Sequence, residues 1–167
     1  MKSKLVKLKH FTGSKATIYS VWFDDIQNTS FDLFLNENIN VFKSELNFII
    51  ERLIAIGNIR GAREQYFKLN EGVPGDGVCA LFDIPGIKLR LYCIRYGTSI
   101  VIVGGGGLKK VNKLQQDKKL KDENYYLRDL SAIITKRIME GEIWYSDDDM
   151  EFEGNLEFND KEDENEL

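Results

Sequence analysis

The strongest constraint on the fold of this chain lies in its middle, where short apolar segments alternate with residues that favour turns. Val73–Gly77 and Ile84–Gly86 each combine proline with glycine, and Gly97-Thr98 suits a tight hairpin. Between and beside these turns lie four segments with the composition of strands, namely Tyr66–Asn70, Val78–Asp83, Lys88–Tyr96 and Ser99–Val103. Three consecutive turns of this kind predict an antiparallel meander.

Helical periodicity precedes the meander. Phe31–Asn36 follows residues suited to an N-cap, and Ile39–Ile56 carries apolar residues at helical spacing and ends beside Gly57. Two helices joined so tightly indicate an αα-hairpin. Three further elements are expected: strands at Lys4–Phe11 and Ala16–Phe23, and a last helix at Asp122–Met139.

This order of elements predicts an α+β fold. We expect an antiparallel sheet of four to six strands, with the αα-hairpin and the C-terminal helix packed on one face. The 167 residues are about the size of one domain, but charge is unevenly distributed along them. Residues 146–167 carry eleven acids and one base, whereas residues 1–145 have a net charge of +6. The sequence therefore predicts a folded domain at 1–145 and an acidic tail at 146–167.

Two roles for the acidic tail stay open at this point. Met150–Glu153 and Leu156–Phe158 alternate in polarity and can form a short hairpin, with the remainder disordered. The tail can be solvated and solubilising. It can also fold back on the basic part of its own or a neighbouring subunit as a nucleic-acid mimic. A homo-oligomer is therefore an open alternative to a monomer.

Several classes of protein and site do not fit this sequence. The start lacks the apolar core of a signal peptide, and no apolar stretch approaches membrane-spanning length, so we expect a cytoplasmic protein. Cys79 and Cys93 lie in apolar runs, as buried free thiols do. Asp147–Asp149 lacks the rest of an EF-hand loop, and Gly104–Gly107 lacks the spacing of a phosphate loop and is expected as a flexible strand exit. We therefore expect no metal and no cofactor.

Strand alternation assigns residues to the two faces of the predicted sheet. Leu89, Leu91 and Cys93 share one face, which the helices would cover. Arg90, Tyr92 and Tyr96 then share the uncovered face, together with Lys68 from a neighbouring strand. Cations beside tyrosine rings suit single-stranded nucleic acid, because phosphates bind the charges and bases stack on the rings. The alternative is a solvated sheet face of the kind that antiparallel sheets commonly have.

An arginine-bearing strand, Leu89–Ile94, is followed by a glycine at Gly97, the apolar strand Ser99–Val103 and the basic pair Lys109-Lys110. In this arrangement the chain resembles the RelE/HigB family of toxins. In that family the arginine-bearing strand reads roughly R-[IL]-x-Y. In this chain the tyrosine comes one place earlier than in that pattern. The helical hairpin and the segment Arg63–Leu69 follow the same order of elements. The resemblance extends from about Ala16 to Arg137, and more by topology than by motif.

This resemblance implies a compact α+β toxin that cleaves messenger RNA on the ribosome and is paired with an antitoxin protein. The ribose 2′-hydroxyl would attack the adjacent phosphate without a metal, and Arg90 would offset the charge on that phosphate. Tyr92 or Tyr96 would stack on a base or relay a proton, and Lys68 would hold the RNA backbone. The other expected RNA contacts are Arg60, Arg63, Lys109 and Lys110.

One departure from the family leaves the activity open. The chain has the glycine run where relatives often carry a histidine or another polar residue, and its sole histidine, His10, is distant in sequence. General acid–base catalysis is typically worth about 10²- to 10⁴-fold, so its loss could leave a binding protein. The alternative function is a non-catalytic protein-binding module, either directed at DNA gyrase, as some relatives are, or a lineage that has lost catalysis.

Overall fold

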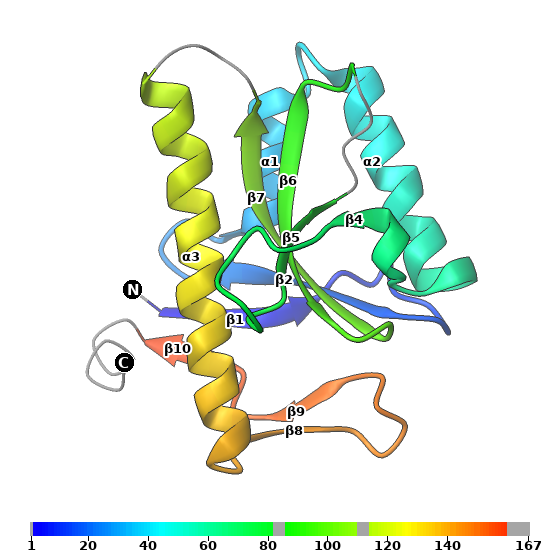
Figure 1. Ribbon diagram of the computed structural model, residues 1–167, viewed down its shortest axis with the longest axis vertical. Coiled ribbons are helices and arrows are strands. Elements are labelled where there is room, and N and C mark those ends of the chain that lie inside the picture. The colour runs from blue at the N-terminus through cyan, green and yellow to red at the C-terminus, as the bar shows by residue number, and fades with distance from the viewer. Residues whose placement is uncertain (1, 82–85, 110–113, 160–167) are drawn as a thin grey trace.

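The computed structural model describes residues 2–81, 86–109 and 114–159. The chain forms an α+β fold in which a mixed, largely antiparallel sheet carries three α-helices (Figure 1). The sheet has the order β10-β1-β2-β7-β6-β5-β4, and β3 pairs with β2. Its strands are β1 (Lys2–Lys7), β2 (Thr17–Phe23), β3 (Asn28–Thr29), β4 (Phe67–Lys68), β5 (Val78–Leu81), β6 (Leu89–Tyr96), β7 (Ile100–Leu108) and β10 (Glu157–Asn159).

The antiparallel meander is confirmed, because β4, β5, β6 and β7 pair in succession as antiparallel neighbours. The sheet also contains one parallel pair, β2 with β7. Between these two strands in the sequence lies the predicted helical hairpin, now α1 (Ser30–Asn38) and α2 (Lys43–Ala55). α1 begins at a side-chain cap, where the hydroxyl oxygen of Thr29 accepts a hydrogen bond from the amide of Asp32 at 3.0 Å.

The remaining elements are two short helices and a C-terminal group. A π-helical turn, η1 (Ile56–Arg60), and a 3₁₀ turn, η2 (Glu64–Tyr66), connect α2 with β4. The last helix, α3 (Leu114–Met139), starts earlier than the sequence predicts. Its first turns are rich in leucine, glutamine and lysine, which favour helix without an apolar stripe. A separate hairpin, β8 (Ile143–Tyr145) with β9 (Phe152–Gly154), follows α3.

The expectation that all helices pack on one face is wrong. α1 and α2 cover one face of the sheet through residues such as Phe31, Phe34 and Leu53. α3 covers the opposite face through Leu127 and Ile134, together with the β8–β9 hairpin (Figure 1). The reason lies in β7, where Ile100 to Val103 are all fully buried, so that both faces of this strand require an apolar cover.

The glycine run is part of β7 and is not a flexible strand exit. A Cβ atom on Gly104 would lie 2.9 Å from the side chain of Leu127, so the absence of a side chain lets α3 approach the strand. A Cβ atom on Gly106 would lie within 1.8 Å of the carbonyl oxygen of Arg90. The glycines are therefore explained by the close approach of α3 on one side and of β6 on the other.

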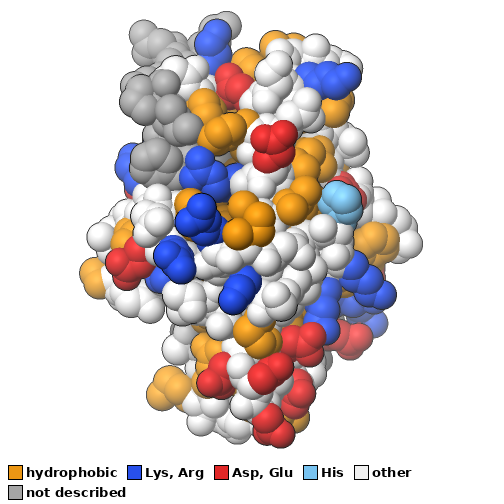
Figure 2. All heavy atoms as spheres, turned by 90° about the vertical axis from the view of Figure 1, so that its right-hand side faces the viewer, with side chains coloured by type: hydrophobic (Ala, Val, Ile, Leu, Met, Phe, Trp, Pro, Cys, Tyr) orange, Lys and Arg blue, Asp and Glu red, His pale blue; other side chains and the backbone are white. Residues whose placement is uncertain are grey.

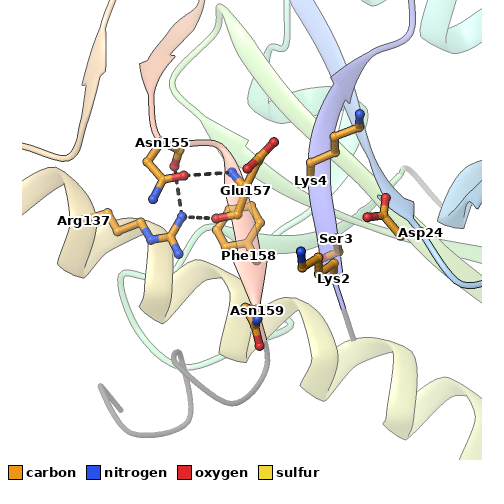
Figure 3. A pocket seen from close by; sticks show the side chains of 9 residues that line it. All are labelled: Lys2, Ser3, Lys4, Asp24, Arg137, Asn155, Glu157, Phe158 and Asn159. Carbon is orange, nitrogen blue, oxygen red and sulfur yellow. Dashed lines mark hydrogen bonds between the residues drawn. The ribbon is translucent and has the colours of Figure 1, made fainter.

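The acidic segment is not a separate unit as far as residue 159. β10 pairs with β1, and Phe152 and Phe158 are buried in the same core as α3. The buried guanidinium of Arg137 donates to the carbonyl oxygens of Asn155 at 2.9 Å and Glu157 at 2.5 Å, which ties β10 to α3 (Figure 3). The core therefore extends past the boundary expected at residue 145, because two apolar side chains anchor an otherwise acidic segment.

As far as residue 159 the segment folds back along β1, at an edge of the sheet, and the remainder, which was expected to be disordered, lies outside the described residues. Within the described part of the segment Glu151 forms an ion pair with Lys7 of β1. A polar pocket of 390 Å³ lies between β1, β10 and α3, with Lys2, Lys4 and Asp24 at its rim (Figure 3). The buried guanidinium in this pocket is that of Arg137, which already donates to the carbonyls of Asn155 and Glu157, so we assign the pocket a structural role.

Candidate nucleic-acid interface

Two of the expected site residues, Lys68 and Arg90, meet at a carboxylate. An oxygen of Glu71 lies 3.5 Å from Nζ of Lys68 and 3.8 Å from Nη1 of Arg90. The backbone carbonyl of Glu71 accepts hydrogen bonds from the side chains of Asn124 at 2.9 Å and Arg128 at 3.2 Å, both on α3. We call these residues, namely Lys68, Glu71, Arg90, Asn124 and Arg128, the Glu71 cluster.

Strand register explains why these groups converge. Lys68 on β4 is directly opposite Ala80 on β5, and Ala80 is opposite Tyr92 on β6, so the three side chains share one face. Arg90 lies two residues before Tyr92 and therefore projects from this same face. α3 crosses the middle of the face, and its Arg128 reaches the segment that follows β4. The cluster forms where the cover provided by α3 ends.

Exposure within the cluster decreases from the sheet edge inwards. The side chain of Lys68 is 50% exposed, that of Arg90 is 20% exposed and that of Glu71 is 19% exposed. The distances from Glu71 to the two cations exceed those of ordinary hydrogen bonds, so the attraction is mainly electrostatic. Such partly solvated pairs are typically worth no more than about 1 kcal/mol each, so an incoming phosphate can compete for the cations.

The expected exposure of Tyr92 and Tyr96 is wrong. Tyr92 is 6% exposed and belongs to the core beneath Leu127 and Leu130 of α3. Tyr96 contacts Phe152 edge-on, with 4.9 Å between the ring centroids. Burial raises the pKa of Tyr96 far above its usual value, so the phenol stays protonated at neutral pH. Neither ring can stack on a base or accept a proton while α3 is docked.

Arg60 and Arg63 lie in a second basic group, around η1 and η2. Nε of Arg63 donates to the carbonyl of Arg60 at 3.0 Å, and both side chains are exposed. Arg52 of α2 lies over the ring of Tyr66, 5.3 Å from its centroid. Arg95 of β6 reaches the same segment, where its Nε donates to the carbonyl of Ala62 at 2.6 Å. Only one residue, Phe67, separates this group from Lys68 in the sequence.

A space-filling view shows the charge pattern on one side of the molecule. On the side of the molecule formed by α2 and β4, Lys and Arg side chains form a run down the middle of the surface (Figure 2). Acidic side chains gather at the lower end of this view, where Figure 1 places the β8–β9 hairpin. The charge asymmetry of the sequence is therefore also an asymmetry of the surface.

Lys109 and Lys110 are the remaining residues that were expected to contact RNA. The amide of Lys109 donates to the carbonyl of Lys88 at 2.8 Å, which puts Lys109 at the same end of the sheet as Arg90. Lys110 lies outside the described residues. His10 is exposed beyond the end of β1, where its ring contacts Phe11 with the centroids 5.2 Å apart. The histidine is therefore not among the groups that β4, β6 and α3 bring to Glu71.

Thiol and metal chemistry find little support in the part of the chain that the structure describes. Cys79 and Cys93 are buried partners on β5 and β6, and burial raises the pKa of Cys79 to about 12. A protonated buried thiol is a poor nucleophile. In the described ranges no group of three or more His, Cys, Asp or Glu residues could hold a metal ion. No helix among these residues is long and apolar enough to cross a membrane.

Sequence reasoning missed Glu71, Asn124 and Arg128. The signal for Glu71 was its position directly after β4 and before the proline-containing turn, but a lone acid there has many interpretations. Asn124 and Arg128 have no local signal, because their role depends on where α3 docks. What the cluster can do chemically follows from its composition: two to three cations can bind a phosphate, and one carboxylate can accept a proton.

Comparison with known proteins adds no identification. No protein-family model matches the chain, and no curated protein or solved structure is significantly similar to it.

Proposed function

We propose that this protein is a RelE/HigB-like toxin that binds messenger RNA at the Glu71 cluster and cleaves it there, in a pair with a cognate antitoxin. The observation that supports this proposal is the convergence of Lys68 and Arg90 on one carboxylate at the open edge of the sheet. Phosphate-binding cations around a proton acceptor are the groups that metal-independent RNA cleavage requires. The order of the helical hairpin and the meander also agrees with the resemblance seen in the sequence.

The proposed chemistry uses three side chains of the cluster. Glu71 accepts the proton of the ribose 2′-hydroxyl as this oxygen attacks the adjacent phosphorus. Arg90 and Lys68 offset the charge that develops on the phosphate oxygens. The bond from phosphorus to the 5′ oxygen then breaks, water protonates the leaving oxygen, and a cyclic phosphate remains. A positioned base typically contributes about 10²- to 10⁴-fold to such a rate.

A second candidate function is a non-catalytic protein-binding module of the same fold. One observation favours it: α3 covers Tyr92, and Tyr96 is partly buried in the same core, so the face expected to hold a substrate is largely closed. Under this alternative the basic surface would contact a protein partner, and no RNA would be cut.

Induced expression in bacteria separates the two candidates. The proposal predicts growth arrest with ribosome-dependent transcript cleavage. Glu71→Gln, which keeps the shape of the side chain, Lys68→Ala and Arg90→Ala should each abolish both cleavage and toxicity. Lys15→Ala is the matched control, since Lys15 is an exposed lysine outside the cluster. Arrest without cleavage, or no arrest, would favour the second candidate, and full toxicity of folded Arg90→Ala would eliminate the site.

The genomic neighbourhood offers a further check on the proposal. A short adjacent open reading frame that encodes a DNA-binding antitoxin is expected. Co-expression of its product should restore growth.

A further inference from the structure

The exposed face of α3 carries an aromatic ring between two cations, next to the Glu71 cluster. Tyr125 is 47% exposed. Nζ of Lys121 lies 5.5 Å from the centroid of its ring, and Cζ of Arg128 lies 4.7 Å from it. These three residues fall at helical spacing on one face of α3. The arrangement places a ring that water can reach beside groups that bind phosphate.

Arg128 links this ring to the proposed site. Its Nε donates to Oδ1 of Asn124 at 2.7 Å, and its Nη2 donates to the carbonyl of Glu71 at 3.2 Å. Asn124 is itself buried and donates to the same carbonyl. The guanidinium is thus held in place by hydrogen bonds on the side facing Glu71, and it contacts the tyrosine ring on the other. A strand bound at Lys68 and Arg90 would therefore reach Tyr125 over Arg128.

From these contacts we infer that α3 provides a stacking platform for single-stranded RNA, with Tyr125 under a base and Lys121 and Arg128 beside its phosphates. This inference rests on the proposed function and names its substrate class. Single-stranded substrate is favoured because only an unpaired base offers a free face to the ring. The acid nearest to Lys121 in sequence, Asp122, forms an ion pair with Lys118 at 2.7 Å. Because the charge of Asp122 is already paired, it reduces the attraction of Lys121 and Arg128 for phosphate only weakly.

The surface beyond Arg128 is shaped to continue such a strand. A groove of 670 Å³ runs along the same face of α3 and is bordered by the loop between β4 and β5. Val73 and Pro74 line it on the loop side, and Ala132 and Met139 line it on the helix side. Apolar walls with Arg128 at one end suit the flat face of a base next to its phosphate. The expected path of the strand is therefore from the Glu71 cluster along α3.

The test is binding of a 2′-O-methyl RNA oligonucleotide, which has no 2′-hydroxyl to attack its phosphates, so that binding is measured apart from cleavage. Fluorescence anisotropy at low salt should show that Tyr125→Ala weakens binding about five- to hundredfold, the usual range for one stacked base. Tyr125→Phe should bind like the unaltered protein, because the ring is retained. Tyr145→Ala is the matched control, since Tyr145 is 40% exposed but lies among the acids of the β8–β9 hairpin.

The outcomes separate this inference from the proposed function. Equal binding by the unaltered protein and Tyr125→Ala would overturn the platform, even if natural RNA were still cleaved at the Glu71 cluster. Equal binding of a single strand and of its duplex would overturn it as well, because a paired base cannot stack on the ring. A selective loss in Tyr125→Ala, together with no cleavage of natural RNA, would support the platform and refute the nuclease. No binding of any RNA would refute both.

Discussion

Replacing Gly106 by alanine should severely destabilise the protein, because the added Cβ atom would collide with the backbone of β6. A Cβ atom on Gly106 would lie 1.8 Å from the carbonyl oxygen of Arg90 and 3.0 Å from Cα of Leu91. Both are backbone atoms, so no side-chain rotation relieves the contact. Carbon atoms at Cβ essentially never approach other heavy atoms closer than 3.0 Å, so the strands must separate by about 1.2 Å at this point.

The cost of that separation can be estimated from its parts. Overpacking of a core costs about 1–3 kcal/mol. The displaced carbonyl also weakens its pairing between the strands, at about 1 kcal/mol for each hydrogen bond. Alanine offsets about 0.4–1 kcal/mol of this loss of stability, because it restricts the conformations of the unfolded chain. We therefore expect Gly106→Ala to lower the free energy of unfolding by about 2–3 kcal/mol, a large part of the 5–15 kcal/mol typical of a domain.

Gly107→Ala is the matched control, one residue further along the same strand. Its Cβ atom would first meet Cγ of Lys119 at 3.3 Å, and a lysine side chain can move. This variant should stay within about 1 kcal/mol of the unaltered protein. Urea unfolding followed by circular dichroism measures both values, and equal slopes would show that the midpoints are comparable. If Gly106→Ala were as stable as Gly107→Ala, the close approach of β6 would not explain the glycine run.

Three further predictions concern the core. Phe152→Ala should lower the free energy of unfolding by about 3–5 kcal/mol in urea titrations, because this ring is buried against Tyr19 and Tyr96; a loss below 1 kcal/mol would show that the acidic segment is only loosely attached. Cys79 and Cys93 should resist Ellman's reagent at pH 8 until urea is added, and rapid reaction of the folded protein would contradict their burial. Stability should also fall at alkaline pH, since burial raises the pKa of Cys79 from 9.0 to about 12. The thiol stays protonated in the folded protein but ionises in the unfolded chain above pH 9, so this contribution is complete below pH 9 and is lost as the pH rises towards 12. The loss from this one group is about 1.4 kcal/mol at pH 10, and Cys79→Ala should flatten that part of the pH profile of urea unfolding; an unchanged profile would contradict the assignment.

Local signals were sufficient for the meander and the helical hairpin. Turn residues and strand alternation act over a few positions, so they determined the pairing of β5 with β6 and of β6 with β7. Alternation also assigned Arg90 and Tyr92 to the same face, and register then brought Lys68 to Arg90. These are short-range properties of a pleated strand, and a sequence contains them directly.

What escaped prediction depends on contacts between distant segments. The continuous apolar run Ile100–Val103 indicates a strand buried on both faces, but it does not identify the element that covers the second face. That element is α3, whose amphipathic stripe would fit either face equally well. The same uncertainty affected the acidic segment, where Phe152 and Phe158 are two of a few apolar residues among many charges. Where these two side chains pack depends on the shape of the assembled core.

The position of α3 also determines which aromatic ring can serve a nucleic acid. By docking on β6 the helix buries Tyr92, while Tyr96 is partly buried against Phe152 in the same core, so neither ring is available as alternation had predicted. The same docking carries Tyr125 to the surface and ties Arg128 to the carbonyl of Glu71. The exposed aromatic ring near the cations of the sheet is therefore Tyr125 of α3, and not Tyr92 or Tyr96 of β6. In an RNA bound here, a base would stack on α3, and the phosphates would lie along the cations of the sheet edge and of α3.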